Sequence, residues 1–449
     1  MFESVLVANR GEIARRVLRT VAALGLKGIA VHSDVDSALP FVREADEAVL
    51  IGPAKPAESY RNADAVLEAA KITGAQAIHP GYGFLSEDAT FARRVIEAGI
   101  TWVGPSPEAI EVMGDKIAAR NAVAAAGVPV APGTTEPLTE VPAALAAAAG
   151  VGFPLMVKAA AGGGGMGMAV AADPAALATE VHRVSTFAAR TFDDARVLLE
   201  RYFPRVRHVE IQVLGLADGR VIALGERECS VQRRHQKLAE ESPSPALDPG
   251  LRVQMAAAAV AAAEAVGYRN AGTVECLLDP TSGEFFFLEM NTRLQVEHPV
   301  TEMVLGIDLV AAQLRIAAGE NPDFDPAALP AGPAGGHAIE LRVNAEDPRR
   351  FLPGPGTITA WREPTGDGVR VDAGYGLGDT VTPFYDSLLA KLVVHGPTRA
   401  QALARARAAV ADFEVSGPKC NLAFFTELLE HPEFVAGDYD TGIVGRMRS

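Results

Sequence analysis

Polar and apolar side chains alternate along residues 289–297, and the polar ones are of types that can bind charged groups and move protons. In an extended chain successive side chains point to opposite faces, so the polar set would line one face of a strand. A solvated hairpin face is the alternative interpretation, and the alternation alone leaves both open. The polar set consists of Glu289, Asn291, Arg293, Gln295 and Glu297.

A turn signal places another carboxylate beside this segment. Residues 279–283 (Asp-Pro-Thr-Ser-Gly) separate two runs rich in β-forming residues, so we predict a β-hairpin that folds Glu275 back against Glu289. With the amide oxygen of Asn291, these carboxylates form a hard-oxygen site suited to Mg²⁺ or Mn²⁺. A magnesium site of this kind usually completes its coordination with water and substrate phosphates.

A glycine-rich loop follows a predicted strand that ends at Lys158. Residues 162–165 are four consecutive glycines, which contribute no side chain to packing and allow bare amides to close around an anion. A flexible hinge is the alternative. The loop is not of the Walker type, because no Lys-Ser or Lys-Thr pair follows the glycines.

Basic residues concentrate between positions 226 and 237 of a chain whose formal net charge is −15. This cluster predicts a second local anion site, although a solvated charged face is the usual alternative. Its members are Arg227, Arg233, Arg234, His235 and Lys237.

The elements that must position these residues alternate between strands and helices at the start of the chain. A strand over 4–8, a helix over 13–24 and a strand over 28–31 form a βαβ opening that resembles a nucleotide-binding fold. The turn holds a single glycine, so dinucleotide binding is not expected. Residues 79–87 leave the end of a later strand, where open α/β sheets bind ligands; a simple Gly/Pro turn is the alternative.

Three further elements are predicted in the second half of the chain. They are a helix over about 302–319, a linker rich in Pro, Ala and Gly over 321–336, and a strand over 337–344. Alternation in that strand places Arg342 on its polar face.

Composition excludes several classes of protein. The 449 residues suffice for two or three domains, and 49% hydrophobic with 22% charged residues is typical of soluble globular proteins. No apolar run reaches the ~20 residues of a membrane helix, and a strand pattern at the N-terminus leaves no room for a signal peptide. Three scattered cysteines indicate a reducing compartment, and the negative charge argues against nucleic acid as the main partner. We therefore expect a cytoplasmic protein that neither binds nucleic acid nor spans a membrane.

Several of these motifs occur together in one known family. The motifs are Ala-Asn-Arg-Gly-Glu-Ile-Ala at 8–14, residues 79–87, the glycine-rich loop, residues 232–237 and residues 289–299. Together they resemble the biotin carboxylase component of biotin-dependent carboxylases, an ATP-grasp enzyme, over essentially the whole chain. The resemblance implies an α/β (α+β) chain with an ATP-grasp fold. Its expected parts are an N-terminal Rossmann-like domain (1–114), an ATP-grasp domain (115–320) with a mobile glycine-rich lid lobe (about 132–203), and a C-terminal biotin carboxylase domain (335–445).

The resemblance also implies roles for individual residues. The ATP-binding set is Lys116, Lys158, Gly163, Gly164, Gly165, Glu200, Arg201, Tyr202, Phe203, His208, Gln232, His235, Glu275 and Glu289. The metal ligands are Glu275, Glu289 and Asn291. The bicarbonate and biotin site is Lys237, Arg293, Gln295, Val296, Glu297, Arg342 and Tyr82. In that site the resemblance makes Glu297 the general base, with Arg293, Lys237 and Arg342 as the other catalytic residues.

The implied activity is ATP-dependent carboxylation of biotin by bicarbonate through carboxyphosphate. This is the first half-reaction of an acyl-CoA carboxylase (acetyl-CoA or propionyl-CoA type) or a pyruvate carboxylase. No Met-Lys-Met motif occurs in the sequence, so biotin is expected on a biotin carboxyl carrier protein or domain, with a carboxyltransferase subunit and a second copy of the chain as further partners. Two alternatives stay open. One is another ATP-grasp ligase, of the carbamoyl phosphate or carboxylate–amine type, and the other is a catalytically silent assembly subunit.

Met166 departs from the family pattern, which usually has a positively charged residue at this place in the glycine-rich loop. One charge-assisted hydrogen bond contributes about 1.5–3 kcal/mol, so Met166→Lys and Met166→Arg are expected to lower the KM for ATP by about tenfold to a hundredfold. The chemical step should change little. Initial rates measured against ATP concentration check this, and an unchanged KM in both variants would show that the missing charge has no effect.

Overall fold

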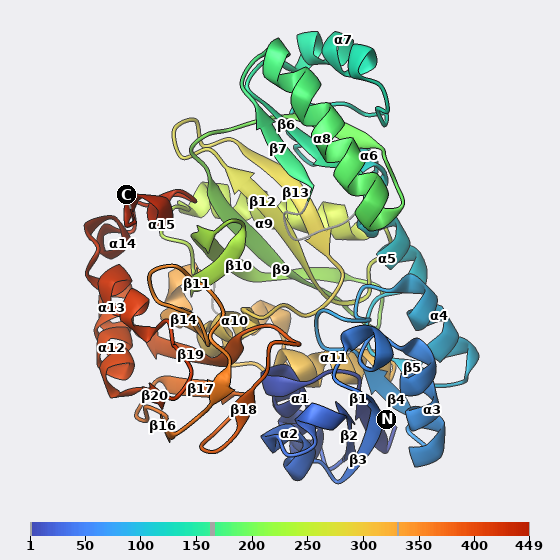
Figure 1. Ribbon diagram of the computed structural model, residues 1–449, viewed down its shortest axis with the longest axis vertical. Helices are drawn as coiled ribbons and strands as arrows, with labels where there is room; N and C mark the ends of the chain where they lie inside the picture. The colour runs from blue at the N-terminus through green and yellow to red at the C-terminus, as the bar shows by residue number, and fades with distance from the viewer. Residues whose placement is uncertain (1, 162–166, 330–331, 449) are drawn as a thin grey trace.

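Five parallel strands form a sheet at the N-terminal end of the chain in a computed structural model that describes residues 2–161, 167–329 and 332–448 (Figure 1). The strand order is β3-β2-β1-β4-β5, and all four neighbouring pairs are parallel. β1 is buried at every position, as expected for a strand covered on both faces. The strands are β1 (Ser4–Val7), β2 (Lys27–Ser33), β3 (Glu47–Gly52), β4 (Ala77–His79) and β5 (Thr101–Trp102). The helices in this part are α1 (Gly11–Ala23), α2 (Pro40–Glu44), α3 (Ala63–Thr73), α4 (Ala89–Glu97) and α5 (Pro107–Gly114).

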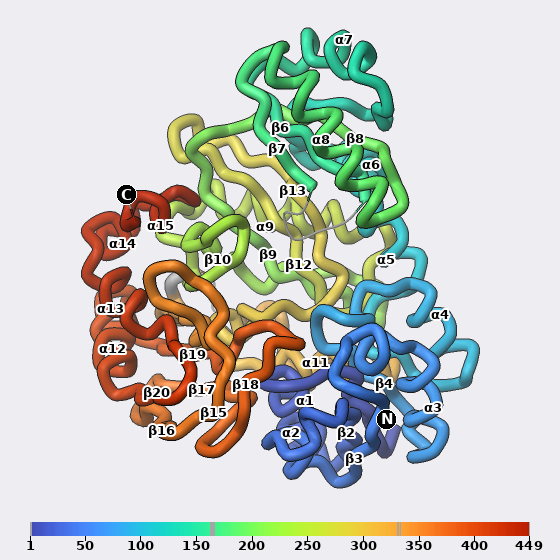
Figure 2. Tube along the Cα trace, viewed as in Figure 1, coloured from blue at the N-terminus to red at the C-terminus, as the bar shows by residue number. Residues whose placement is uncertain are grey.

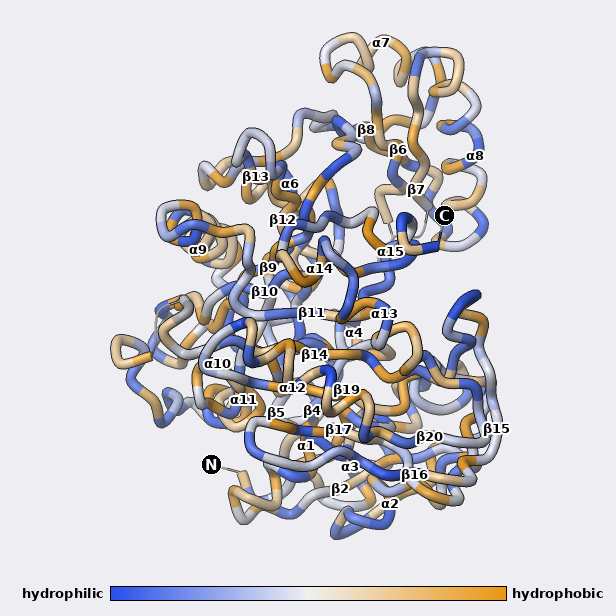
Figure 3. Tube along the Cα trace, turned by 90° about the vertical axis from the view of Figure 1, so that its left-hand side faces the viewer, coloured by the Kyte–Doolittle hydropathy of each residue, from blue (hydrophilic) through white to orange (hydrophobic). Residues whose placement is uncertain are grey.

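A small lobe stands above the rest of the molecule, as the side view shows (Figure 3). Its antiparallel sheet has the order β7-β6-β8 and shares one apolar core with two helices. The strands are β6 (Leu155–Ala159), β7 (Met168–Ala171) and β8 (Val197–Arg201), and the helices are α7 (Val141–Val151) and α8 (Pro174–Phe192). The glycine-rich loop connects β6 to β7, and residues 162–166 of this loop lie outside the described residues.

An eight-stranded antiparallel sheet carries most of the predicted site. Its order is β13-β12-β9-β10-β11-β14-β19-β17, so strands from the middle and the end of the sequence lie side by side (Figure 2). β11 pairs with β14 directly, and the predicted linker therefore connects two parts of one continuous sheet. The strands are β9 (Arg207–Gly215), β10 (Val221–Arg233), β11 (Gln236–Ser242), β12 (Asn270–Leu278), β13 (Phe285–Asn291), β14 (His337–Asn344), β17 (Val369–Ala373) and β19 (Leu388–Gly396).

Helices cover this sheet with apolar side chains. Met255 and Ala259 of α9 share a core with Val209 and Val274 of the strands beneath them. Val300 and Val304 of α10 pack on Ala338 and Val393 at the other end of the sheet. The remaining helices are α6 (Lys116–Ala125), α9 (Pro249–Glu264), α10 (His298–Leu305), α11 (Leu309–Ala317), α12 (Arg399–Asp412), α13 (Leu422–Glu430), α14 (Pro432–Ala436) and α15 (Ile443–Arg446). Two short ladders pair β15 (Gly356–Thr357) with β18 (Thr380–Val381), and β16 (Ala360–Arg362) with β20 (Glu414–Ser416).

The structure corrects two sequence-based expectations. The helix predicted over 302–319 is two helices, because Gly306 ends α10 with φ 69° and the Asp308 side chain caps the start of α11. The extended segment predicted over 289–297 ends at Asn291, and the chain then turns until Glu297, which precedes the first residue of α10. The polar side chains beyond Asn291 are therefore not presented by strand alternation.

Candidate active site

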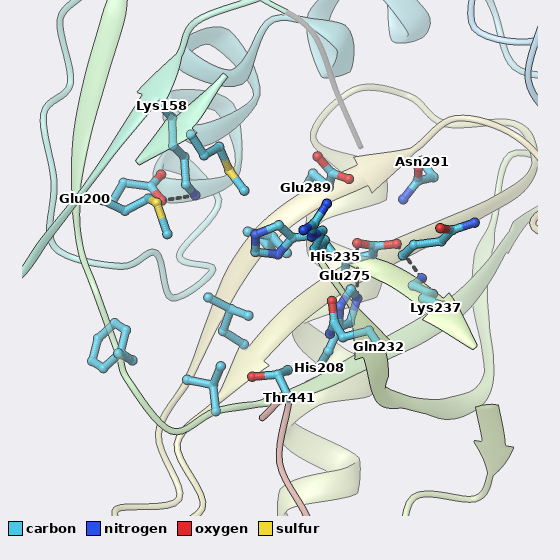
Figure 4. A pocket seen from close by; sticks show the side chains of 18 of the residues that line it. Lys158, Glu200, His208, Gln232, His235, Lys237, Glu275, Glu289, Asn291 and Thr441 are labelled. Carbon is cyan, nitrogen blue, oxygen red and sulfur yellow. Dashed lines mark hydrogen bonds and ion pairs between the residues drawn. The ribbon is translucent and has the colours of Figure 1, made fainter. Parts of the chain in front are cut away.

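A cavity of about 800 Å³ lies between the small lobe and the eight-stranded sheet. Lys158 and Glu200 reach it from the small lobe, and Glu275, Glu289 and Asn291 reach it from the hairpin β12–β13 (Figure 4). Segments more than 280 residues apart in the sequence thus share one cavity, since Lys158 and Thr441 both line its wall.

Most of the predicted site residues line this cavity. They are Lys116, Lys158, Glu200, Arg201, Tyr202, Phe203, His208, Gln232, His235, Lys237, Glu275, Glu289, Asn291, Arg293, Gln295, Val296, Glu297 and Arg342. Gly163, Gly164, Gly165 and Met166 lie outside the described residues. Tyr82 is not among the lining residues, and its hydroxyl donates to Glu12.

The upper part of the cavity combines apolar walls with lysines. Sequence analysis did not identify the apolar lining residues Met156, Met168, Val206, Leu277 and Leu288, nor Thr441 and Gly442 of the C-terminal segment. The only sequence signal for these lining residues was the alternation of apolar positions on β6, β7 and the hairpin strands. The same alternation is expected of strands whose apolar side chains pack in the protein core. An apolar slot beside Lys116 and Lys158 suits a heterocyclic ring joined to phosphates.

Lys158 is ion-paired with Glu200 in this structure. Lys116 is largely buried, and burial lowers its pKa. The Glu289 carboxylate raises this pKa, but its effect is smaller than that of burial. Both ammonium groups are therefore largely withdrawn from solvent, where an anionic ligand would gain more from them than in water.

Lys237 is the centre of the lower part of the cavity. Its Nζ lies 2.6 Å from Glu210 Oε2, 2.8 Å from Glu275 Oε1 and 2.7 Å from Glu297 Oε1. All four side chains are almost completely buried. A single buried cation thus holds three carboxylates that would otherwise repel one another.

Arg342 reaches the same carboxylate from β14. Its Nε donates to Glu240 Oε1 at 2.6 Å and its Nη2 donates to Glu297 Oε2 at 3.0 Å. Burial alone would raise the pKa of Glu297, but Lys237, Arg342 and Arg227 together hold it well below its usual range. Glu297 is therefore ionised and has a cation at each oxygen.

The donor set at the hairpin fits a hard divalent cation. Glu275 and Glu289 are directly opposite each other in the β12–β13 ladder, and Asn291 follows two residues later. Burial raises the pKa of Glu289, and the neighbouring Glu275 carboxylate raises it further. Asn291 Oδ1 accepts from Arg293 Nη2 at 2.9 Å, and this oxygen would exchange that hydrogen bond for the cation. Two carboxylates that repel each other and an adjacent amide oxygen match the ligands of Mg²⁺, which would relieve the repulsion.

A second cluster of possible metal ligands already contains the ammonium group of a lysine. His208, Glu210 and Glu275 offer ligand atoms within 4.8 Å of one another. The Lys237 ammonium, however, lies between the carboxylates of Glu210 and Glu275. The cation at this position is therefore the lysine.

Arg227 lies beneath the cavity, and the prediction that it contributes to an anion site is wrong. It is completely buried, and five hydrogen bonds use all of its donors. Its partners are Glu210 Oε1 (2.5 Å), Gln212 Oε1 (2.7 Å), Thr301 Oγ1 (3.0 Å), Thr273 Oγ1 (3.0 Å) and Gln295 Oε1 (2.8 Å). Because the Gln295 oxygen is taken by Arg227, its amide nitrogen faces Glu275 Oε1 at 2.9 Å. Arg227 thereby fixes the orientation of a cavity residue.

Arg227→Lys is expected to lower the free energy of unfolding by about 3–5 kcal/mol, because an ammonium cannot replace the planar fork and leaves buried partners unsatisfied. Urea unfolding monitored by circular dichroism measures this change. Arg220→Lys is the matched control, since Arg220 forms an exposed ion pair with Asp218 and should show no measurable change. Equal stability of the two variants would contradict the role of Arg227.

The segment 79–87 contacts the residues after β13 through its last residue, Glu87. Glu87 accepts hydrogen bonds from Arg293 Nε at 3.0 Å and from the backbone N–H of Thr292 at 3.2 Å. His79 is fully buried and bonded to Gln313 at 3.1 Å, so it supports the wall without reaching the cavity. The loop thus anchors the turn that follows β13.

Comparisons with known proteins show the family to which this chain belongs. The biotin carboxylase N-terminal domain matches residues 1–110, the ATP-binding domain of the carbamoyl-phosphate synthase L chain matches 115–323, and the biotin carboxylase C-terminal domain matches 340–446. Biotin carboxylase 2 of Bacillus subtilis is 47% identical over 441 residues, which covers 98% of each chain.

Two solved structures superpose closely. A biotin carboxylase from Campylobacter jejuni, described as a complex with β,γ-ATP, has a TM-score of 0.96, 42% identity and 99% coverage of both chains. The biotin carboxylase domain dimer of the Hydrogenobacter thermophilus 2-oxoglutarate carboxylase, described as a complex with MgADP, ADP and bicarbonate, has a TM-score of 0.95 and 42% identity. It covers 99% of this chain and 98% of that one. Full-length identity near one half, with matching N- and C-terminal domains, leaves a single assignment: this chain belongs to the biotin carboxylase family and has its ATP-grasp fold.

Proposed function

We propose that this protein carboxylates biotin with bicarbonate at the expense of ATP, through carboxyphosphate. The observation that carries the proposal is Glu297, a buried carboxylate held between Lys237 and Arg342 in the same cavity as the slot bounded by Lys116 and Lys158. This arrangement supplies a base next to an anion site and places both beside a phosphate site.

Glu297 removes the proton of bicarbonate in this proposal. A carboxylate with a depressed pKa is a weak base, so its basicity must rise when substrate binds. Lys237 and Arg342, which depress the pKa of Glu297, are also the donors that an incoming bicarbonate would engage. When the anion takes these donors and adds its own negative charge, the pKa of Glu297 rises toward the working range. The base is thereby activated by the substrate itself.

Phosphoryl transfer from ATP to bicarbonate spreads negative charge over the transferring oxygens. Lys116, Lys158 and Lys237 all line the cavity and can meet that charge. Glu275, Glu289 and Asn291 would hold Mg²⁺, which supplies charge neutralisation at the phosphates when bound. His208 Nε2 lies 3.1 Å from Glu275 Oε2 and fixes that carboxylate.

Carboxyphosphate breaks down to carbon dioxide and phosphate. Biotin must lose its ureido proton, which the released phosphate can accept, before it attacks the carbon dioxide, and this loss leaves negative charge on the ureido oxygen. Arg293 and Arg342 both line the cavity beside Glu297 and are the cations available to that oxygen. Leaving such an oxyanion buried without a cation would cost several kcal/mol, on the order of an unpaired buried charge.

The same proposal assigns partners and organisation. Biotin arrives on a carrier protein or domain, and a carboxyltransferase subunit uses the product. The chain acts in the cytoplasm as a homodimer built from domains 1–114, 115–320 and 335–445. No described helix is long and apolar enough to cross a membrane.

Release of phosphate from ATP tests the function. We expect it to require bicarbonate and Mg²⁺ and to increase when free biotin is added. Another ATP-grasp ligase would instead respond to ammonia or to an amine substrate, and a silent subunit would release no phosphate under any of these conditions. Bicarbonate-independent hydrolysis that ignores biotin would overturn the proposal.

A further inference from the structure

Two glutamates that the proposed reaction does not use face each other beside the cavity. Glu240 of β11 and Glu340 of β14 are direct partners in the antiparallel ladder, where opposite side chains lie about 5 Å apart at Cβ. Glu240 is 1% exposed and Glu340 is 0% exposed. Two carboxylates directly opposite each other in a dry sheet would repel strongly if both were ionised.

Their oxygens are left without ordinary hydrogen-bond donors. Among the described residues, neither oxygen of Glu340 and only one oxygen of Glu240 has a hydrogen-bond partner. That one, Glu240 Oε1, accepts from Arg342 Nε. Buried acceptors without donors are costly, and a carboxylate with none is the costliest case. A proton placed between the two side chains satisfies an orphaned oxygen on each of them.

We propose that Glu240 and Glu340 share one proton, so that the pair acts as a single negative charge that positions Arg342 against Glu297. The Glu340 carboxylic acid donates to Glu240 Oε2, and the opposite oxygen of Glu240 accepts from Arg342. The result is a chain of hydrogen bonds from Glu340 through Glu240 and Arg342 to Glu297 Oε2. Both glutamates are positioning residues, and neither is required to touch substrate.

The charged groups around the pair agree with one bound proton. Arg342 and Glu297 face both glutamates, Lys237 faces Glu240 from β11, and Lys391 faces Glu340 from β19. Lys391 is committed to Glu12 at 3.0 Å and to the Val296 carbonyl at 3.0 Å. Burial raises the pKa of Glu240 to about 7, against the lowering effect of Arg342. Burial raises the pKa of Glu340 well above its usual value, despite Lys391.

The shared proton reduces the negative charge around Arg342, which is proposed to bind substrate. If both glutamates were ionised, Arg342 would face three carboxylates and offer little to a bound anion. With one proton bound to the pair, the single negative charge on Glu240 orients the guanidinium of Arg342 through its Nε. The Nη2 of Arg342 then stays directed at Glu297. The inference about Arg342 thus rests on the proposed function, whereas the existence of the shared proton does not.

Infrared spectroscopy of the protein without substrate tests the proton directly. A protonated carboxyl group has a C=O stretching band that carboxylates lack and that shifts in D₂O. We expect Glu340→Gln to lose such a band at neutral pH. Glu226→Gln is the matched control and should keep it, because Glu226 is equally buried but ion-paired with Arg252 at 2.7 Å. An unchanged band in Glu340→Gln would overturn the proposal even if biotin carboxylation is confirmed.

Kinetics test the positioning role separately. Glu340→Ala removes the donor to Glu240 and is expected to raise the KM for biotin by roughly tenfold, the effect of about one lost buried hydrogen bond. Glu340→Gln should recover most of this loss, because its amide N–H can donate as the carboxylic acid does. The alkaline limb of its pH–rate profile should also move to higher pH, since the amide cannot lose the proton. If Gln and Ala behave alike, or if the alkaline limb does not move, the positioning role is wrong.

Discussion

Glu297→Gln will abolish bicarbonate-dependent ATP cleavage while leaving ATP binding nearly unchanged. The amide keeps the shape of the side chain and can still accept from Lys237 or Arg342, but it cannot take a proton. Loss of a positioned general base typically costs about 10²–10⁴-fold in rate, and we expect an effect in this range on kcat. Phosphate release measures turnover, and titration calorimetry with an ATP analogue measures binding.

Glu284→Gln is the control for this variant. Glu284 lies exposed in the turn of the same hairpin, next to β13, and should retain full activity. Glu297 is held by Lys237 and Arg342, whereas the proposed nucleotide slot is bounded by Lys116 and Lys158, so nucleotide affinity should not follow the loss of turnover. Full turnover in Glu297→Gln would reject the base assignment, and a parallel loss of ATP binding would show that the side chain is structural.

Lys237→Met will lower kcat by about 10³-fold or more and will also destabilise the fold. The variant leaves Glu210, Glu275 and Glu297 buried without the cation that they share. Breaking a buried ion pair by removing one partner typically costs about 3–5 kcal/mol, and in this case three carboxylates lose a partner together. The rate loss follows because Lys237 is also a proposed donor to bicarbonate and to the transferring phosphoryl group.

The stability loss in Lys237→Met should depend on pH in a defined direction. The pKa of Glu297 is depressed in the folded protein, so this carboxylate stabilises the fold above its unfolded pKa, and the contribution is lost as pH falls through the folded value. Without Lys237 the folded pKa rises, so the stability difference from the wild type should be largest near neutral pH and shrink as pH falls into and below the usual range of glutamate pKa values.

Urea unfolding across this pH range measures the difference. Lys27→Met is the control, because Lys27 pairs with Glu47 at 2.7 Å on the surface and should change neither turnover nor stability. A stability difference that is independent of pH would show that the methionine perturbs packing and that the lost charge is not the cause.

Local patterns in the sequence were sufficient for the hairpin that carries the proposed metal ligands. The turn at 279–283 and the alternation on both sides of it predict the hairpin, and the ladder pairs Glu275 with Glu289 as expected. Turn chemistry and side-chain period act over a few residues, so they can be read without knowledge of the rest of the chain. The same reasoning failed beyond Asn291, where the strand ends and the chain turns until α10 begins at His298.

The meeting of distant segments was decided by the tertiary structure. Pairing of β11 with β14 brings Arg342 and Lys237 to the two oxygens of Glu297, and it also sets Glu240 opposite Glu340. Arg227 and Lys237 belong to one basic cluster in the sequence, yet one is sealed beneath the cavity and the other opens into it. Residue types and their spacing fix which chemistry is available to a segment. Which face of that segment is buried, and against what, depends on how the sheets and helices pack, and that in turn sets the charge and protonation state of each group.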